Sequence, residues 1–440
     1  MNKSTKVKII HILPRFPHPL IKSISNPLTY FDTEEKRKQY IDISEPPYWV
    51  GFFEDDHHVN AAKHILDLTD EFAVECWRPY GNGVDKIYEK EVGEIKHKVF
   101  PGFKITIPHI GTLTWSRSMV KEIKREIEKN NVILNVSVGH VWSHIFLFFA
   151  LAPLKKKIPI VAKHRSSGFK RFIFKQLKPW KRFFKWYYFL FDKIELKSLK
   201  YVDYYFTHSL LELSYLRNQI NFDRALFHRA GIDFSKVKPA TTEEKIALRK
   251  KLNLPQDKKI LIAQGNFNSR TYGYQNLIHC FKDIKNTSEG DDLALVIIGG
   301  YKHEDLYEVG VKAGAIMVER VPNDVFYEYL RASDFFSKAF FSETIIKFGG
   351  IGTSTIEALA MGLPVITNNL IHFQGSLDER KQLGLLMETD EALTKSIIQM
   401  KNNLHLYNNC RQIAQKYYNL KNSNQILLEK YRELSKQYFG

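Results

Sequence analysis

Short β-rich runs alternate with helical stretches along almost the whole chain, and this alternation constrains the fold more than any other feature. It is typical of a parallel β-sheet whose strands are joined by crossover helices. In the first half the predicted strands are Val7–Leu13, Phe72–Trp77, Val132–Val138, Ile158–Lys163 and Val202–Thr207. After Pro239 a second series predicts strands at Lys259–Ala263, Leu293–Ile298, Ala315–Val318, Phe335–Phe340 and Pro364–Thr367. We therefore expect an α/β protein with two doubly wound domains.

The composition is that of an ordinary globular protein. The chain has 440 residues, which is enough for two domains. It is 44% hydrophobic and 26% charged, which excludes collagen-like, coiled-coil and wholly disordered chains. The three cysteines are far apart, so they predict neither a disulfide framework nor a Cys-x-x-Cys metal site. We expect a reduced, cytoplasmic setting.

The chain is strongly basic, with a formal net charge of +17. Such a protein is drawn to nucleic acid, anionic lipid or phosphorylated small molecules. Residues 168–190 (GFKRFIFKQLKPWKRFFKWYYFL) interleave basic and aromatic side chains. This composition suits an interfacial helix on anionic lipid, an ordinary helix with an aromatic core face, or stacking on single-stranded nucleic acid. Because no nucleic-acid motif is present, we expect no nucleic-acid partner. The composition leads us to expect peripheral contact with the inner face of a membrane.

One segment combines a glycine-rich turn, a helix and a buried strand in an order that suits a phosphorylated ligand. Residues 349–367 read GGIGTSTIEALAMGLPVIT. Thr353 or Ser354 is expected to cap a helix that carries Glu357 in its first turn. The helix N-terminus then offers free N–H groups to a diphosphate, and Glu357 can accept hydrogen bonds from sugar hydroxyls. The alternative is an ordinary helix whose glutamate only suits the helix dipole.

This segment resembles the donor-binding motif of nucleotide-sugar glycosyltransferases of the GT-B fold, and most of all that of the retaining group 1 family. The family's motif ends in Glu-Ala-x-Ala-x-Gly-x-Pro-Val, which is matched here by Glu357, Ala358, Ala360, Gly362, Pro364 and Val365. Weaker likenesses follow in the family's order at residues 229–233, 293–300 and 318–334. The resemblance implies two Rossmann-like domains with C-terminal helices that cross back to the N-terminal domain.

The resemblance also implies which residues bind the donor, although some positions depart from the family's pattern. The family has another Glu eight residues before the ribose-binding one, and this position is Gly349 here. The Arg and Lys that hold the diphosphate in the family are replaced by Asn266 and Tyr272, so we expect Arg270 to supply the charge. The full set of expected donor-binding residues is Gly265, Arg270, Lys347, Gly349, Gly350, Gly352, Thr353, Ser354 and Glu357.

In the family the first domain binds the acceptor and places a His or an acidic group near the transferred sugar. His140 and His164 end two successive predicted strands, in VSVGHVWSH and PIVAKHRSS. Open α/β sheets bind ligands at the C-terminal ends of their strands, where a His can bind a sugar or move a proton. The catalytic residues expected are therefore His140, His164 and Arg270. The alternative for each histidine is a hydrogen-bonded structural side chain.

Together these features predict a glycosyltransferase that uses a UDP- or GDP-linked sugar. The expected acceptor is a glycan or lipid-linked saccharide, in cell-surface polysaccharide or glycolipid synthesis. By the resemblance, transfer is retaining and needs no metal or other cofactor, because the helix N-terminus and cations meet the charge of the leaving group. The domains expected are 1–235 for the acceptor, 236–415 for the donor and 416–440 as a helix returning to the first domain. The alternatives are an inverting outcome, a ligand- or partner-binding protein without transfer, and a nucleic-acid-binding protein.

Overall fold

The computed structural model divides the chain into two compact units, and each is considered by itself. It describes residues 6–13, 41–42, 49–50, 57–80, 85–107, 111–138, 145–164, 185–229, 231–265, 273–300, 305–319, 321–338, 346, 349–387, 389 and 392–440. The first unit comprises Met1–His208, Glu212–His228 and Asn424–Gly440, and the second comprises Ser209–Leu211 and Arg229–Ser423. The last helix of the chain therefore begins in the second unit and ends in the first.

The first unit is built on a sheet in the order β12-β11-β10-β9-β1-β4-β6-β5, in which only β5 is antiparallel to its neighbour. Its strands are β1 (Val7–Ile12), β4 (Phe72–Tyr80), β5 (Tyr88–Val92), β6 (Ile95–Pro101), β9 (Val132–Val138), β10 (Ile160–His164), β11 (Tyr204–Thr207) and β12 (Ala225–Phe227). Two antiparallel pairs accompany it, formed by β2 (Ile41–Asp42) with β3 (Trp49–Val50) and by β7 (Phe103–Ile107) with β8 (Gly111–Trp115). The order reverses between β1 and β9, which makes the sheet doubly wound.

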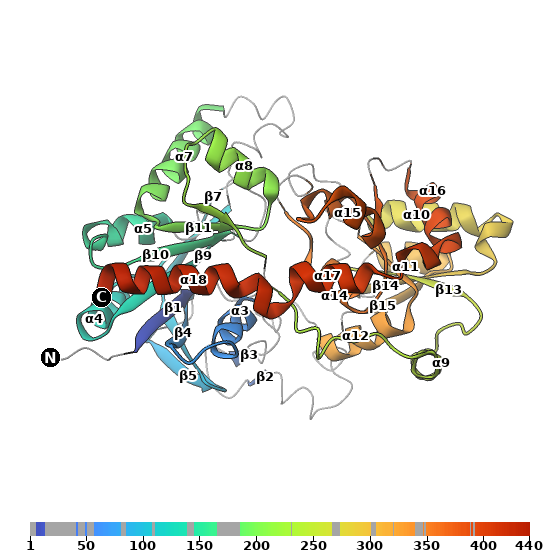
Figure 1. Ribbon diagram of the computed structural model, residues 1–440, viewed down its shortest axis with the longest axis horizontal. Helices are drawn as coiled ribbons and strands as arrows, with labels where there is room; N and C mark the ends of the chain where they lie inside the picture. The colour runs from blue at the N-terminus through green and yellow to red at the C-terminus, as the bar shows by residue number, and fades with distance from the viewer. Residues whose placement is uncertain are drawn as a thin grey trace. The chain divides into compact units, whose positions relative to one another are not determined.

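Helices cover both faces of this sheet (Figure 1). They are α3 (His57–Leu66), α4 (Arg117–Lys129), α5 (Ile145–Leu151), α7 (Lys185–Ser198), α8 (Leu210–Asn218) and α18 (Leu420–Phe439). One core cluster joins the sheet to α3 and α18, and another joins its other face to α4, α5 and α8. Leu427, Leu428, Tyr431 and Leu434 of α18 are buried in the first cluster. The expected return of the C-terminal helix to the first domain is confirmed.

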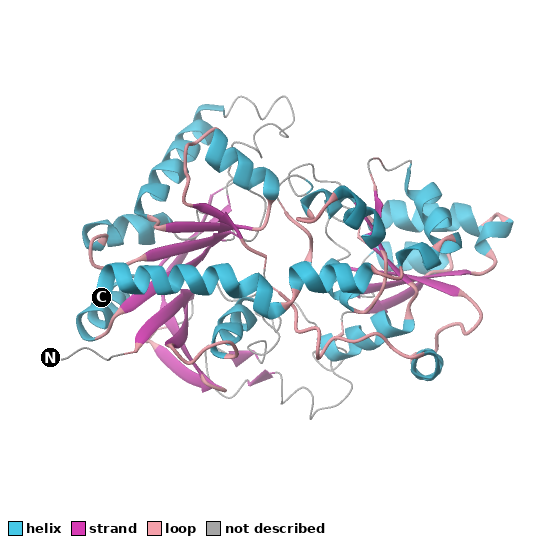
Figure 2. Ribbon diagram, viewed as in Figure 1, coloured by secondary structure: helices cyan, strands magenta, loops and turns pink. Residues whose placement is uncertain are grey.

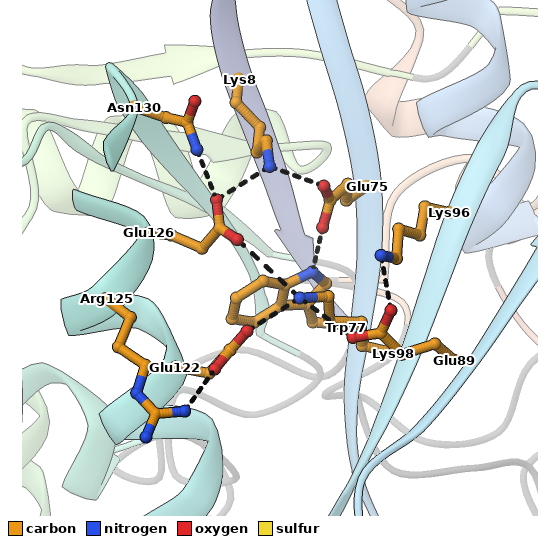
Figure 3. Close-up of polar contacts among 10 residues, drawn as sticks. All are labelled: Lys8, Glu75, Trp77, Glu89, Lys96, Lys98, Glu122, Arg125, Glu126 and Asn130. Carbon is orange, nitrogen blue, oxygen red and sulfur yellow. Dashed lines mark hydrogen bonds and ion pairs between the residues drawn. The ribbon is translucent and has the colours of Figure 1, made fainter. Parts of the chain in front are cut away.

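A network of ion pairs fixes helix α4 to the first sheet (Figure 3). Lys8 Nζ lies 2.7 Å from Glu75 Oε1 and 2.8 Å from Glu126 Oε2 of α4. Lys98 Nζ on β6 lies 2.9 Å from Glu122 Oε1 of the same helix. Burial works to lower the pKa of Lys98, but the hydrogen bond and charge of Glu122 outweigh it, so the pKa is raised. The network therefore favours the charged form of Lys98.

The second unit repeats the plan with a six-stranded, all-parallel sheet in the order β15-β14-β13-β16-β17-β18. Its strands are β13 (Lys259–Gln264), β14 (Leu293–Gly300), β15 (Ile316–Glu319), β16 (Phe335–Ser337), β17 (Val365–Thr367) and β18 (Gly384–Leu386). Its helices are α9 (Thr242–Lys251), α10 (Tyr274–Lys285), α11 (Asp305–Lys312), α12 (Asn323–Ala332), α14 (Thr353–Ala360), α15 (Leu377–Leu383), α16 (Ala392–Asn402) and α17 (Cys410–Tyr418).

The helices of the second unit again lie on both faces of the sheet (Figure 2). One cluster packs α12, α14 and α17 against β13, β14, β16 and β17, and the other packs α10 and α16 on the opposite face. The ten strands expected from the sequence all appear, with shifts at their ends. The strand expected at Phe335–Phe340 ends at Ser337 in the part that the structure describes. Among the described residues, no helix combines the length and apolarity needed to cross a bilayer.

Candidate functional site

The glycine-rich segment forms a turn that leads into helix α14 of the second unit. Gly350 has a φ of +62°, a left-handed conformation that favours glycine. The cap is Gly352, with extended backbone, and the helix begins at Thr353. The expected caps, Thr353 and Ser354, are therefore wrong, because the hydroxyls of both residues bond cations instead. Glu357 consequently lies in the second turn of the helix and not in the first.

Two side chains of the 3₁₀ helix η7 (Asn368–His372) hold this turn from within the unit. Asn369 Nδ2 donates a hydrogen bond to the carbonyl oxygen of Gly350. His372 Nε2 lies 2.6 Å from the carbonyl oxygen of Ile346 and donates to it. Burial lowers the pKa of His372 and so favours the neutral ring, against a smaller opposing effect of this bond. Asn369 thus holds the turn at Gly350, and His372 holds the backbone just before it at Ile346.

Glu357 lies at the centre of a small polar cluster. Tyr327 Oη of α12 donates a hydrogen bond of 3.0 Å to Glu357 Oε1. Burial raises the pKa of Glu357, while the Tyr327 hydroxyl and the charges of Lys338 and Arg229 act in the opposite direction. The carboxylate is therefore an acceptor with one donor in place, and it retains lone pairs for hydroxyl groups of a ligand.

Two cations that were not expected from the sequence reach the N-terminal end of α14. Lys338 Nζ donates to Ser354 Oγ over 2.6 Å, and Lys338 is only 8% exposed. Burial lowers the pKa of Lys338 to about 8, although the charge of Glu357 acts to raise it. Arg229 Nη2 donates to Thr353 Oγ1 over 2.7 Å. Positive side chains at a helix N-terminus face the positive end of the helix dipole, so this end of α14 is strongly electropositive.

The topology of the second sheet explains why these groups meet. The strand order reverses between β13 and β16, and open α/β sheets bind ligands beside the carboxyl ends of the strands at such a point. Lys338 is the first residue after β16, and Gly265 is the first after β13. A Cβ on Gly265 would lie 2.0 Å from Tyr274 Oη, so any other residue there would force the Tyr274 side chain to move. Strand order was the signal that could have singled out Lys338.

The structure brings together only part of the expected set. Gly349, Gly350, Gly352, Thr353, Ser354 and Glu357 form one turn and helix, and Gly265 directly follows strand β13. His164 is the last residue of β10, as expected, but only its backbone is described. His140, Arg270 and Lys347 fall in stretches that the structure does not describe, as do residues 168–184 of the basic aromatic segment. Within the described ranges, no group of three or more His, Cys, Asp or Glu side chains is placed to hold a metal ion.

Comparisons with known proteins identify the segment that carries this site. Residues 244–417 match the family described as "Glycosyl transferases group 1". A curated relative is TuaC of Bacillus subtilis (strain 168), named for glycosyl transfer in teichuronic acid biosynthesis, with 26% identity over 167 residues. The match covers 38% of this chain and 39% of TuaC, so the chain spans about two fifths of the length of its curated relative. The matched segment lies within the second unit, and the expected resemblance of this segment to the group 1 glycosyltransferases is confirmed.

Solved structures match the chain over nearly its whole length. HepE of Anabaena, crystallised with UDP, has a TM-score of 0.59 and 11% identity, and the match covers 97% of this chain and 100% of HepE. WaaG, a glycosyltransferase involved in lipopolysaccharide biosynthesis, has a TM-score of 0.58 and 14% identity, with 98% and 100% covered. A glycosyltransferase from Rickettsia africae has a TM-score of 0.59 and 15% identity, with the same coverage. At these identities the likeness concerns the fold, and it confirms the GT-B architecture.

Proposed function

We propose that the protein is a glycosyltransferase that moves a sugar from a UDP- or GDP-linked donor to a glycan or lipid-linked saccharide. The observation that carries this proposal is Glu357, a carboxylate held by Tyr327 beside an electropositive helix N-terminus. It lies in a segment that matches the group 1 glycosyltransferases, at the point where the strand order reverses. The complex of HepE with UDP supports a UDP-sugar, and the name of TuaC, a teichuronic acid biosynthesis glycosyltransferase, supports a cell-surface polysaccharide.

In this proposal each group has a separate task. Glu357 accepts hydrogen bonds from the hydroxyls of the nucleotide ribose. The amides of the Gly349–Gly352 turn and the start of α14 face the phosphates. As the bond from the sugar to the diphosphate breaks, negative charge grows on the leaving group, and this electropositive end of the helix stabilises it without reorganisation. Transfer then needs no metal ion. His140 and His164 of the first unit are proposed to contact the transferred sugar or the acceptor.

The substitution Glu357→Gln tests the assignment of the ribose site. The amide keeps the shape of the side chain but loses the charge that strengthens its hydrogen bonds, which are worth about 1.5–3 kcal/mol when one partner is ionised. We expect the dissociation constant for the nucleotide, measured by calorimetry, to rise roughly tenfold or more. The melting temperature without ligand should stay close to that of the wild type. Wild-type affinity in the folded variant would contradict the assignment.

The stereochemistry and the metal requirement are tested together by product analysis. Once an acceptor is found, proton NMR of the first product formed gives the anomeric configuration directly. The proposal predicts that the configuration of the donor is retained and that the rate is the same in EDTA. An inverted product would contradict the proposed retention. Activity that returns only with added divalent cation would contradict transfer without a metal ion.

Contact with a membrane surface is the remaining part of the proposal. It is supported by the composition of residues 168–190 and by the net charge of +17. Binding to vesicles that contain anionic lipid, with little binding to neutral ones and a loss at high salt, is the expected result. If the protein binds neither kind of vesicle, the proposal of a lipid-linked acceptor loses this support.

A further inference from the structure

The first turn of α14 carries three consecutive hydroxyl side chains, and one of them has no partner. Thr353 and Ser354 accept hydrogen bonds from Arg229 and Lys338. The hydroxyl of Thr355 is fully buried and bonds to no other group of the protein among the described residues. A buried hydroxyl without a partner costs free energy, so its presence at a helix N-terminus points to a group that is supplied from outside.

The unpartnered hydroxyl and the buried lysine border the same small space beside Gly352. A Cβ built on Gly352 would lie 3.5 Å from Lys338 Nζ and 3.6 Å from Thr355 Oγ1. These are ordinary contact distances, and Gly352 has a φ of −63°, which any residue adopts. Neither backbone strain nor a clash with the protein therefore requires glycine here. The glycine therefore leaves a small opening, with room for about one methyl-sized group, beside an ammonium group and a hydroxyl.

The charge of this corner suits an anion. Lys338 and Arg229 both lie near the positive end of the dipole of α14, and Glu357 is the carboxylate that acts on both of them among the described residues. The capping glycine has no side chain to accept hydrogen bonds from the first amides of the helix. An oxyanion in the opening beside Gly352 would meet an ammonium group, a hydroxyl and these amides at once.

We propose that Lys338 is a phosphate-binding residue, which together with Thr355 holds an oxygen of the donor diphosphate beside Gly352. This inference rests on the proposed function and deepens it, because it assigns the cation at the phosphate end of the site. The lysine follows β16, whereas Arg270 and Lys347, the candidates from the sequence, belong to other segments. Lys338 is then also placed to meet the charge that grows on the leaving diphosphate.

Calorimetry with a nucleoside diphosphate and its nucleoside tests the inference. The probes are UDP and uridine, or GDP and guanosine if GDP is the nucleotide that binds. In Lys338→Met we expect the dissociation constant of the diphosphate to rise on the order of 10- to 100-fold, the range for a hydrogen bond to a charged group. Binding of the nucleoside should be unchanged. Lys338→Arg should restore much of the lost affinity, which a purely structural role for the lysine would not predict.

Two further variants keep the test decisive. Gly352→Ala should fold normally, because its methyl group meets nothing closer than 3.5 Å, yet it fills the opening and should weaken the diphosphate selectively. Lys312→Met on α11 removes an exposed positive charge and should leave both affinities unchanged. Wild-type diphosphate affinity in Lys338→Met and Gly352→Ala would overturn the inference while leaving the proposed function intact. Binding of neither probe by the wild-type protein would overturn the proposed function itself.

Discussion

At the residue scale, the proposed donor site combines the carboxylate of Glu357, held by Tyr327, with two cations, Lys338 and Arg229, at the first turn of α14. Glu357 could be proposed from the sequence because it belongs to a contiguous motif whose helix and strand are both local. Lys338 and Arg229 gave no such signal, since their partners on α14 lie 16 and 124 residues away. The cap was also placed wrongly: the helix begins at Thr353, earlier than expected, so Thr353 and Ser354 lie inside it and Gly352 is the cap. The role of a single charged residue can be proposed only once the strand order shows which groups lie beside it.

Tyr327 provides a prediction at this scale. Its hydroxyl donates to Glu357 over 3.0 Å and fixes the carboxylate. In Tyr327→Phe the carboxylate loses this bond, so we expect nucleotide affinity to fall several-fold, less than in Glu357→Gln. Replacing Tyr329 of the same helix by Phe is the control, because no hydrogen bond of its hydroxyl is recorded in the described part of the chain. Calorimetry with the same nucleotide gives both values, and equal affinities would show that the Tyr327 bond does not matter.

At the element scale, strands buried on both faces were predictable, and strands that depend on distant pairing were not. Strand β14 (LALVIIGG) is a nearly continuous apolar run, and the central strands β1 (VKIIHI) and β9 (VILNVSV) are largely apolar, which marks them in the sequence. Strand β5 forms only because it pairs antiparallel with β6, and β18 only because it pairs with β17. Their own sequences, YEKEV and GLL, carry little information. Likewise the position of α4 depends on partners elsewhere in the chain, through Lys8 and Lys98.

The attachment of α4 gives a prediction of stability. Lys98 Nζ faces carboxylates of Glu89, Glu122 and Glu126, and it stacks on the ring of Trp77. Lys98→Met removes the common partner of these carboxylates, which keep Lys8, Lys96 and Arg125 as other partners, so we expect a loss of about 1–3 kcal/mol of unfolding free energy. The control is Lys96→Met, a half-exposed pair with Glu89, which should cost less than about 1 kcal/mol. Denaturant unfolding followed by circular dichroism measures both free energies. Equal losses in the two variants would show that the burial of Lys98 does not increase its contribution to stability.

The turn of the site gives a prediction of pH dependence. Burial keeps His372 neutral in the folded protein, with a pKa below its usual 6.5. Below that pH the unfolded chain binds a proton that the folded chain resists, so the free energy of unfolding falls as the pH drops below about 6.5. In His372→Gln this contribution should be absent, and the slope between pH 5 and 7 correspondingly smaller. Identical slopes in thermal melts of the two proteins would rule out His372 as the cause.

At the scale of the whole molecule, the chain forms two α/β units of the same plan, and its last helix links them in sequence. Residues 424–439 of α18 contribute four buried apolar side chains to the first unit, among them Leu427 at 1% exposure. Leu427→Ala should therefore cost about 2–5 kcal/mol of stability. Nucleotide affinity should stay at the wild-type value, because the proposed donor site lies in the second unit. The exposed Leu406→Ala is the control, and a loss of affinity in Leu427→Ala would contradict this separation.

The central claim, a nucleotide-sugar site built on α14, is tested most directly by melting the purified protein with UDP, GDP, ADP, CMP and their sugar conjugates in EDTA. A ligand at about a hundred times its dissociation constant stabilises the folded state by about 2.7 kcal/mol, which a melting curve resolves. We predict a shift with one nucleotide and its sugar conjugate, and a much smaller one in Glu357→Gln. No shift with any of them in a folded sample would contradict the account and favour a glycosyltransferase-like protein without transfer.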